Sequence, residues 1–187
     1  PKKSRERKWV RYERKHSNSL WHTDWFILNG KNTIAYLDDA SRLATCVMQF
    51  DNATALNSAV ALTKAISKWK TPKQLMSDHG TQFTSLPRET CNDPEPNTFQ
   101  AKLRELGIQH IKARVKHPQS NGKVERFIPT IRFLYKHFGE LDKAVEYYNM
   151  RRPHMSLESD SIKTPYEAFL EKMEVSNGKV FNVQSGH

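Results

Sequence analysis

The sequence predicts an α/β fold in which a mixed five-stranded sheet is flanked by helices. Three extended segments near the start of the chain are joined by short turns, and helical segments then alternate with two further short strands. Hairpin-type strands followed by alternating helices and strands are typical of a mixed sheet with helices packed on it. The 187 residues, 37% of them hydrophobic, suit a single domain with a proper core.

The first three strands are predicted from apolar runs and from the turn residues between them. Leu20–Leu28 is rich in aromatic and aliphatic side chains, and Asn29-Gly30 directly after it is a two-residue β-hairpin signal. The chain then returns over Asn32–Leu37, and Ala44–Phe50 forms the third strand. These segments make up the hairpin-connected part of the predicted sheet.

Helical periodicity begins after the third strand. Apolar residues recur at steps of 4, 3, 4 and 3 over residues 53–70, which places them on one helix face, and Pro72 ends this helix. The residues of that face are Ala55, Ala59, Leu62, Ile66 and Trp69. Gln74–Ser77 and Ile108–Ile111 are predicted as the last two strands. The other predicted helices are one marked by Phe99, Leu103 and Leu106 and ended by Gly107, and three at about residues 122–138, 141–150 and 165–173.

The charge is uneven along the chain. The formal net charge is +10, and residues 1–18 hold eight Lys or Arg against two Glu. A basic leader of this kind either binds a polyanion such as nucleic acid or is a solvated tail, and charge alone leaves both readings open. We therefore divide the chain into a basic leader (1–18), a core (19–175) with an inserted Pro-rich loop (85–97), and a C-terminal tail (176–187).

Composition excludes several classes of protein. The two cysteines, Cys46 and Cys91, form no CxxC pair, which argues against a disulfide scaffold and a zinc finger and fits a reducing compartment. The eight histidines show no HxxxH or HExxH spacing, so no separate zinc site is predicted. No apolar run approaches the roughly 20 residues that span a membrane, and the start of the chain lacks the apolar segment of a signal peptide. We expect no membrane partner.

Three carboxylates stand where separate elements could direct them into one pocket. Asp24 lies in the middle of a strand, Asp78 directly follows a short strand, and Glu125 lies on the helix that starts near residue 120. Each alone also fits a structural role: an edge residue, a turn cap or a solvated helix face, respectively. Together they are the oxygen ligands that Mg²⁺ prefers, and a pair of such ions catalyses in-line phosphoryl displacement. The sequence therefore suggests phosphoryl transfer on nucleic acid.

Helical periodicity divides the helix that carries Glu125 into two faces. Val124, Phe127, Ile131 and Phe138 share the face that we expect to be buried. Asn121, Glu125 and Arg132 share a second face, at steps of 4 and 7.

The motifs around these carboxylates resemble those of a known family. They are Leu20-Trp-His-Thr-Asp24-Trp, Ser77-Asp78-His-Gly-Thr-Gln-Phe83, His117-Pro-Gln-Ser-Asn-Gly-Lys-Val-Glu125-Arg-Phe127, Tyr147-Tyr-Asn-Met-Arg-Arg-Pro-His-Met-Ser-Leu157 and Thr164-Pro-Tyr-Glu-Ala-Phe169. In this order they resemble the catalytic core of the retroviral-integrase superfamily, specifically bacterial and archaeal insertion-sequence transposases with a DDE triad. The resemblance covers roughly residues 8–173.

The resemblance implies a ribonuclease H-like fold and a DNA transposase or integrase core that cleaves DNA ends and transfers strands. It implies that Asp24, Asp78 and Glu125 are the triad, with Asp24 bridging two Mg²⁺ (or Mn²⁺) ions and each of the others completing one side. The implied partners are duplex DNA, as element ends and target, and further copies of the chain in a homodimer or higher oligomer. The implied location is the prokaryotic cytoplasm, at the nucleoid when the protein is on DNA.

Further residues are candidates for DNA contact. Lys112, Arg114 and Lys116 alternate along an extended segment and could follow a phosphate backbone, although a solvated loop has the same pattern. The resemblance adds Asn121 and Lys123, in the stretch that lies along the DNA end in the family. It also adds Arg132, at a position usually basic there.

The chain departs from the family pattern in four ways. The interval between Asp78 and Glu125 exceeds the usual one by about the length of the 85–97 loop, and His79 stands where many relatives have Asn or Arg. The family's N-terminal end-binding module is absent from the sequence. Pro129 lies inside the helix of Glu125, where it would clash with the Glu125 carbonyl and either re-aim the carboxylate or mark a decayed copy. The alternatives are therefore a nuclease without strand transfer and a catalytically inactive DNA-binding or assembly module.

Overall fold

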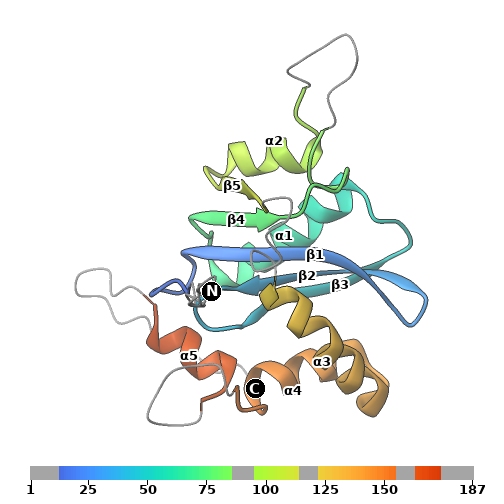
Figure 1. Cartoon of the computed structure of the whole chain (residues 1–187), viewed down its shortest axis with the longest axis vertical. Coiled ribbons are helices and arrows are strands. Elements are labelled where there is room, and N and C mark those ends of the chain that lie inside the picture. Colours follow the sequence, from blue (N-terminus) through green and yellow to red (C-terminus); the bar gives the residue numbers. More distant parts are fainter. Residues whose placement is uncertain (1–12, 86–94, 114–121, 155–162, 174–187) are drawn as a thin grey trace, which may run out of the picture.

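The central feature of the structure, a computed structural model, is a five-stranded mixed sheet (Figure 1). The described residues are 13–85, 95–113, 122–154 and 163–173. The strand order is β3-β2-β1-β4-β5, antiparallel from β3 to β1 and parallel from β1 to β5. The strands are β1 Leu20–Leu28, β2 Lys31–Asp38, β3 Ala44–Phe50, β4 Gln74–Ser77 and β5 Gln109–Lys112. This confirms the predicted fold class.

The first hairpin forms at the predicted turn. Leu28 pairs with Lys31, so Asn29 and Gly30 are the whole loop. Both have positive φ, 51° and 75°, as a type I′ turn requires. The Asn-Gly pair therefore sets the register of β1 against β2.

The helices begin and end close to the predicted positions. They are α1 Ala55–Trp69, α2 Thr98–Glu105, α3 Gly122–Phe138, α4 Leu141–Met150 and α5 Pro165–Glu171. Thr54 accepts a hydrogen bond from the Asn57 amide and caps α1. The last strand was predicted one residue early, because the Ile108 amide bonds the Leu103 carbonyl at 2.9 Å and closes the end of α2.

The sheet separates two hydrophobic cores. On one face Trp21 packs with Leu62 of α1 and Phe99 of α2. On the other face, Phe26 packs with Phe127 of α3 and Tyr148 of α4. In Figure 1, α2 lies at one end of the molecule and α4 and α5 lie at the other. We call the sheet face that packs against α3 and α4 the α3/α4 face.

The predicted buried faces are largely confirmed. On α1, Ala59, Leu62 and Trp69 are buried, while Ala55 and Ile66 are half-buried. On α3 the buried residues are Val124, Phe127, Ile131 and Leu134. Phe138 was expected among them but is half-buried, because it ends the helix and stacks on Tyr147 of α4, with ring centroids 5.1 Å apart.

Two further observations concern the inserted loop and the length and polarity of the helices. Ser85 Oγ donates to the Glu95 carbonyl at 2.7 Å, which closes the base of the inserted loop, while residues 86–94 lie outside the described part. Among the helices of the described residues, none is both long and apolar enough to cross a bilayer.

Asn149 is the polar link between α4 and the sheet. Its side chain accepts from the Ala44 amide at 2.9 Å and donates to the Ala44 carbonyl at 3.0 Å, and it is 5% exposed. We expect Asn149→Ala to lower the free energy of unfolding by about 2 kcal/mol, because both buried backbone groups lose their partner. Chemical denaturation measures this difference.

The matched control is Asn52→Ala, at an exposed position just after β3. This substitution should change stability by no more than about 0.5 kcal/mol. Equal effects of the two substitutions would contradict a stabilising role for the Asn149 bridge.

Candidate active site

Asp24 lies on β1, on the face that carries α3 and α4. Side chains alternate along a strand, so Asp24 shares its face with Phe26 and Leu28, which pack in the core of the α3/α4 face. Asp24 itself is half-buried, and its Oδ1 accepts a hydrogen bond from the Trp25 amide at 2.8 Å. The strand thus holds a carboxylate among apolar neighbours, in partial contact with water.

Asp78 lies beside Asp24 at the end of the neighbouring parallel strand. β1 and β4 pair with His22 opposite Met76, and two more residues in this register bring Asp78 opposite Asp24. Adjacent strands are about 4.8 Å apart. Asp78 Oδ1 accepts from the Gly80 amide at 2.9 Å, which shapes the turn that follows β4.

His79 also has a structural contact in this turn. Its Nε2 lies 2.7 Å from the Ala113 carbonyl, so the ring donates there and links the turn to the end of β5. Of two possible roles for His79, a hydrogen bond to DNA or shaping of the turn, this contact favours the second.

Glu125 lies in the first turn of α3 and is exposed. Val124 and Phe127, on either side of it in the sequence, are 0% and 2% exposed and pack under the sheet. The buried pair seats the helix on the α3/α4 face and leaves Glu125 directed away from the core, as the helical period predicted. α3 runs through Pro129 without a break in the assigned helix.

Electrostatics couples the three carboxylates. Burial, the negative charge of Asp78 and, least of the three, the charge of Glu125 raise the pKa of Asp24 to about 6, against the hydrogen bond from Trp25. The described residues nevertheless contain no group of three acidic, His or Cys side chains close enough to hold a metal ion as they stand. Electrostatic coupling is compatible with this spacing of the carboxylates, because charge repulsion acts over a longer distance than metal coordination.

The residues present fit a hard divalent cation by their chemistry. All three candidate ligands are carboxylates, which are the donors that Mg²⁺ and Mn²⁺ favour. Asp24 and Asp78 each use Oδ1 for a local backbone hydrogen bond, so their Oδ2 atoms can turn toward a cation without loss of that bond. The raised pKa of Asp24 reflects burial and the repulsion of its neighbours, and a bound cation would offset both.

The predicted DNA-contact residues fall into three groups. Arg114, Lys116 and Asn121 lie outside the described residues. Lys112 is exposed at the end of β5. Arg132 is exposed on α3 and donates to the Ile27 carbonyl at 3.1 Å.

Lys123, the remaining candidate, pairs with a buried carboxylate. Its ammonium contacts the Asp39 carboxylate and lies 3.3 Å from the Asp39 carbonyl. Asp39 also accepts from His22 Nε2 at 2.7 Å and from the Arg14 amide at 2.6 Å. Burial alone would raise the pKa of Asp39, but the hydrogen bond and charge of His22 and the charge of Lys123 together hold it well below its usual value.

Sequence reasoning missed this arrangement of His22, Asp39 and Lys123. The only signal in the sequence is Asp38-Asp39, two consecutive acidic residues at the end of a strand. Of these two residues, Asp38 has a local structural role, because its carboxylate accepts hydrogen bonds from the Ser41 amide and hydroxyl, at 2.9 and 2.7 Å, and so caps the following turn. The partners of Asp39 are distant in sequence and left no local pattern.

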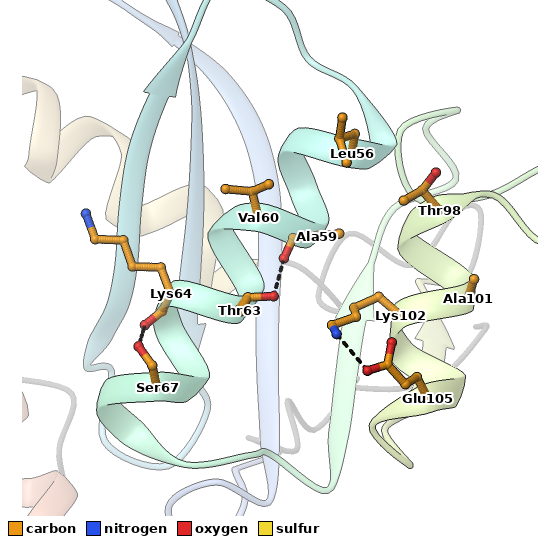
Figure 2. Close-up of a pocket in the computed structure, with 10 residues that line it drawn as sticks. All are labelled: Leu56, Ala59, Val60, Thr63, Lys64, Ser67, Thr98, Ala101, Lys102 and Glu105. Carbon is orange, nitrogen blue, oxygen red and sulfur yellow. Dashed lines mark hydrogen bonds and ion pairs between the residues drawn. The ribbon is translucent and has the colours of Figure 1, made fainter.

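A groove of about 660 Å³ lies between α1 and α2, on the sheet face opposite the three carboxylates (Figure 2). Figure 2 shows Leu56 and Val60 of α1 and Ala101 of α2 among its lining, with Lys102 paired to Glu105 at 2.8 Å. The lining is mainly apolar and brings no carboxylate cluster together. The groove is therefore separate from the candidate active site.

Comparison with protein families gives a match over most of the chain. A family profile described as "Integrase core domain" matches residues 14–118, more than half of the chain, and a second profile of the same description matches residues 106–161.

Curated relatives agree with these matches. A "Putative integrase ORF3" of Spiroplasma virus SpV1-C74 is 28% identical over 156 residues, which is 75% of this chain and 42% of that protein. The "Transposase for transposon Tn552" of Staphylococcus aureus is 31% identical over 139 residues, 64% of this chain and 27% of that protein. The chain thus spans less than half the length of these two relatives.

Solved structures show the same fold. The catalytic core domain of BIV integrase aligns with a TM-score of 0.63 and 25% identity, over 82% of this chain and 95% of that chain. A chain of the simian T-cell lymphotropic virus intasome, in complex with PP2A regulatory subunit B56 gamma, aligns with a TM-score of 0.70 and 18% identity, over 94% and 63%. The HTLV-2 integrase catalytic core in complex with magnesium aligns with a TM-score of 0.64 and 19% identity, over 82% and 97%. The fold is ribonuclease H-like, as the motif resemblance implied.

The raised pKa of Asp24 predicts a stability effect. A carboxyl whose pKa is higher in the folded than in the unfolded state destabilises the metal-free fold as pH rises from about 4 through 6. We expect Asp24→Asn to stabilise the metal-free protein by about 2 kcal/mol at pH 7.5, and by little at pH 4, where folded Asp24 is already protonated. Denaturation in the presence of a chelator at both pH values measures this.

Asp51→Asn is the matched control, because Asp51 is an exposed carboxylate at the end of β3. It should leave stability unchanged within about 0.5 kcal/mol at both pH values. If Asp24→Asn gave no gain at pH 7.5, burial and the neighbouring carboxylates would not be raising the pKa of Asp24 in the folded state.

Proposed function

The chain belongs to the integrase core domain family, and we propose that it is the catalytic core of a DNA transposase or integrase that cleaves DNA ends and joins them to a target. The proposal rests on one observation above the others. Burial of Asp24 on β1, together with the negative charges of Asp78 and Glu125 on two other elements, raises its pKa to about 6. Carboxylates that are partly buried and coupled in this way are enriched at functional sites.

We propose Asp24, Asp78 and Glu125 as the residues that would hold two Mg²⁺ or Mn²⁺ ions. When bound, such ions lower the pKa of an attacking water and offset the negative charge that develops at phosphorus. Asp24 is the carboxylate whose element contacts those of both others, because β1 pairs with β4, which leads into Asp78, and packs against α3, which carries Glu125. No side chain of the protein serves as nucleophile in this scheme.

The proposed reaction has two steps of one type. In the first, water attacks the phosphodiester at the element end and the 3′-oxygen leaves, which frees a 3′-hydroxyl. In the second, that hydroxyl attacks a phosphodiester of the target, a new P–O bond forms, and the target 3′-oxygen leaves. Each step exchanges one P–O bond for another, so no energy source or covalent protein intermediate is required.

Basic residues near the carboxylates support duplex DNA as the substrate. Lys112 is exposed at the end of β5, next to the strand that carries Asp78, and Arg132 is exposed two turns beyond Glu125 on the same helix. We propose both, together with Arg114, Lys116, Asn121 and Lys123, as contacts to the DNA backbone. Phosphate contacts of this kind position DNA without reading its sequence.

We also propose that the working protein is at least a dimer. Two DNA ends must be joined to the target together, and one chain offers one set of three carboxylates. The HTLV-2 core has been solved in dimeric and trimeric forms.

One rival function has an observation in its favour. A catalytically inactive DNA-binding or assembly module is consistent with the described residues, in which no three metal-ligating side chains lie close enough to hold an ion. A nuclease on the same scaffold is the other rival, because it needs only the first step. Metal binding separates the first rival from the proposal, and the nature of the product separates the second.

The test is a branched DNA that mimics the joined product, incubated with the full chain and Mn²⁺. Reversal of joining uses the same carboxylates, and it should release the DNA end and reseal the target strand. We expect Glu125→Gln to reduce the rate about 100-fold or more. Glu146→Gln, at an exposed position on α4, is the matched control and should retain full activity.

The products distinguish the candidate functions. Released ends with a resealed strand support the transposase or integrase core, whereas nicked DNA without resealing indicates the nuclease. Absence of both products, together with no measurable Mn²⁺ binding by the wild-type chain, would establish the inactive module.

A further inference from the structure

Asp39 connects the two elements that carry Asp24 and Glu125. It binds His22 on β1 and Lys123 on α3, and each of these lies two residues before one of the acidic residues. His22 and Asp24 share a face of β1, since residues two apart in a strand point the same way. A single buried carboxylate thus lies between the positions that precede both proposed ligands.

We propose that Asp39 is a positioning residue that fixes the first turn of α3, and with it Glu125, against β1. The proposed role rests on the proposed function, because Glu125 matters only as a ligand. Asp39 is itself firmly held: it is 1% exposed, accepts from the Arg14 amide, and contacts β1 through His22 and α3 through Lys123.

The geometry of the helix explains how the contact acts on Glu125. Successive residues of an α-helix are rotated by about 100°, so Lys123, Val124 and Glu125 point in three directions around the first turn. Val124 is fully buried and sets the depth of the turn on the sheet. The Lys123–Asp39 pair then sets its rotation, and a rotation that separated the pair would swing the Glu125 carboxylate by the same angle.

Pro129 makes this side-chain anchor more important. The backbone amide of residue 129 would normally donate to the Glu125 carbonyl, but proline has no N–H. The first turn of α3 therefore lacks one of the hydrogen bonds that would hold it to the rest of the helix. The Lys123–Asp39 pair and the burial of Val124 supply the constraint from outside the helix.

The test uses full-length chains with Lys123→Met, Lys123→Arg and Asp39→Asn. Mn²⁺ affinity is measured by titration of the metal alone, and DNA affinity is measured separately without metal. We expect Lys123→Met and Asp39→Asn each to weaken Mn²⁺ binding about 10-fold, with little further loss in the double variant and no loss of DNA affinity for Asp39→Asn. Lys123→Arg keeps the charge and should restore most of the affinity.

Lys136→Met is the matched control, because Lys136 is exposed in the last turn of the same helix and loses the same charge. It should leave Mn²⁺ affinity unchanged. If Lys123→Met weakened DNA binding while Mn²⁺ affinity stayed at the wild-type value, Lys123 would act only as a DNA contact and the positioning role would be overturned.

Hydrogen exchange separates failure of this role from failure of the proposed function. Amides of residues 126–128, which donate to the carbonyls of the first turn of α3, should exchange faster in Lys123→Met and Asp39→Asn than in the wild type, with or without metal. Unchanged exchange would overturn the positioning role. A wild-type chain that binds no Mn²⁺ but shows the faster exchange in the variants would refute the proposed function and still support the anchor.

Discussion

Strand β1 is the constraint on which the rest of the structure depends. It pairs with β2 on one side and β4 on the other, and its alternate side chains enter both hydrophobic cores. Trp21 is fixed on one face, and Phe26 and Leu28 on the other, so Asp24 cannot rotate out to solvent without breaking two ladders. The carboxylate is therefore held in a partly apolar environment that it would avoid in a more mobile segment.

Asp39 and Asp24 both lose contact with water in the fold, but their pKa values shift in opposite directions. Asp39 is more deeply buried than Asp24, yet its pKa falls, because His22 and Lys123 offset its charge. Burial and the charges of two other carboxylates raise the pKa of Asp24 to about 6, against one backbone hydrogen bond. Among the described residues, cationic partners lie against Asp39 and none lowers the pKa of Asp24. That contrast is the physical argument for a site completed from outside the chain.

Local patterns predicted most of the fold, and distant contacts account for what they missed. The Asn29-Gly30 turn, the alternation of β1 and the period of α3 are all encoded within a few residues, and the structure has each of them where the sequence indicates. Period alone also placed Glu125 on an exposed helix face. The Lys123–Asp39 pair joins residues 84 positions apart, so no local pattern could reveal it. Lys123 was consequently predicted only as a DNA contact.

The effect of Pro129 on α3 depends on the tertiary contacts around the first turn of that helix. In the sequence it counted against a working site, since proline weakens a helix interior. In the structure α3 continues through it, and the missing hydrogen bond falls at Glu125, the residue whose placement matters most. A helix turn held by its own backbone would need no external anchor, whereas this one is flanked by a buried Val124 and an ion pair to Asp39. The position of the first turn is thus governed by tertiary contacts with the sheet, which links the geometry of Glu125 directly to that of β1.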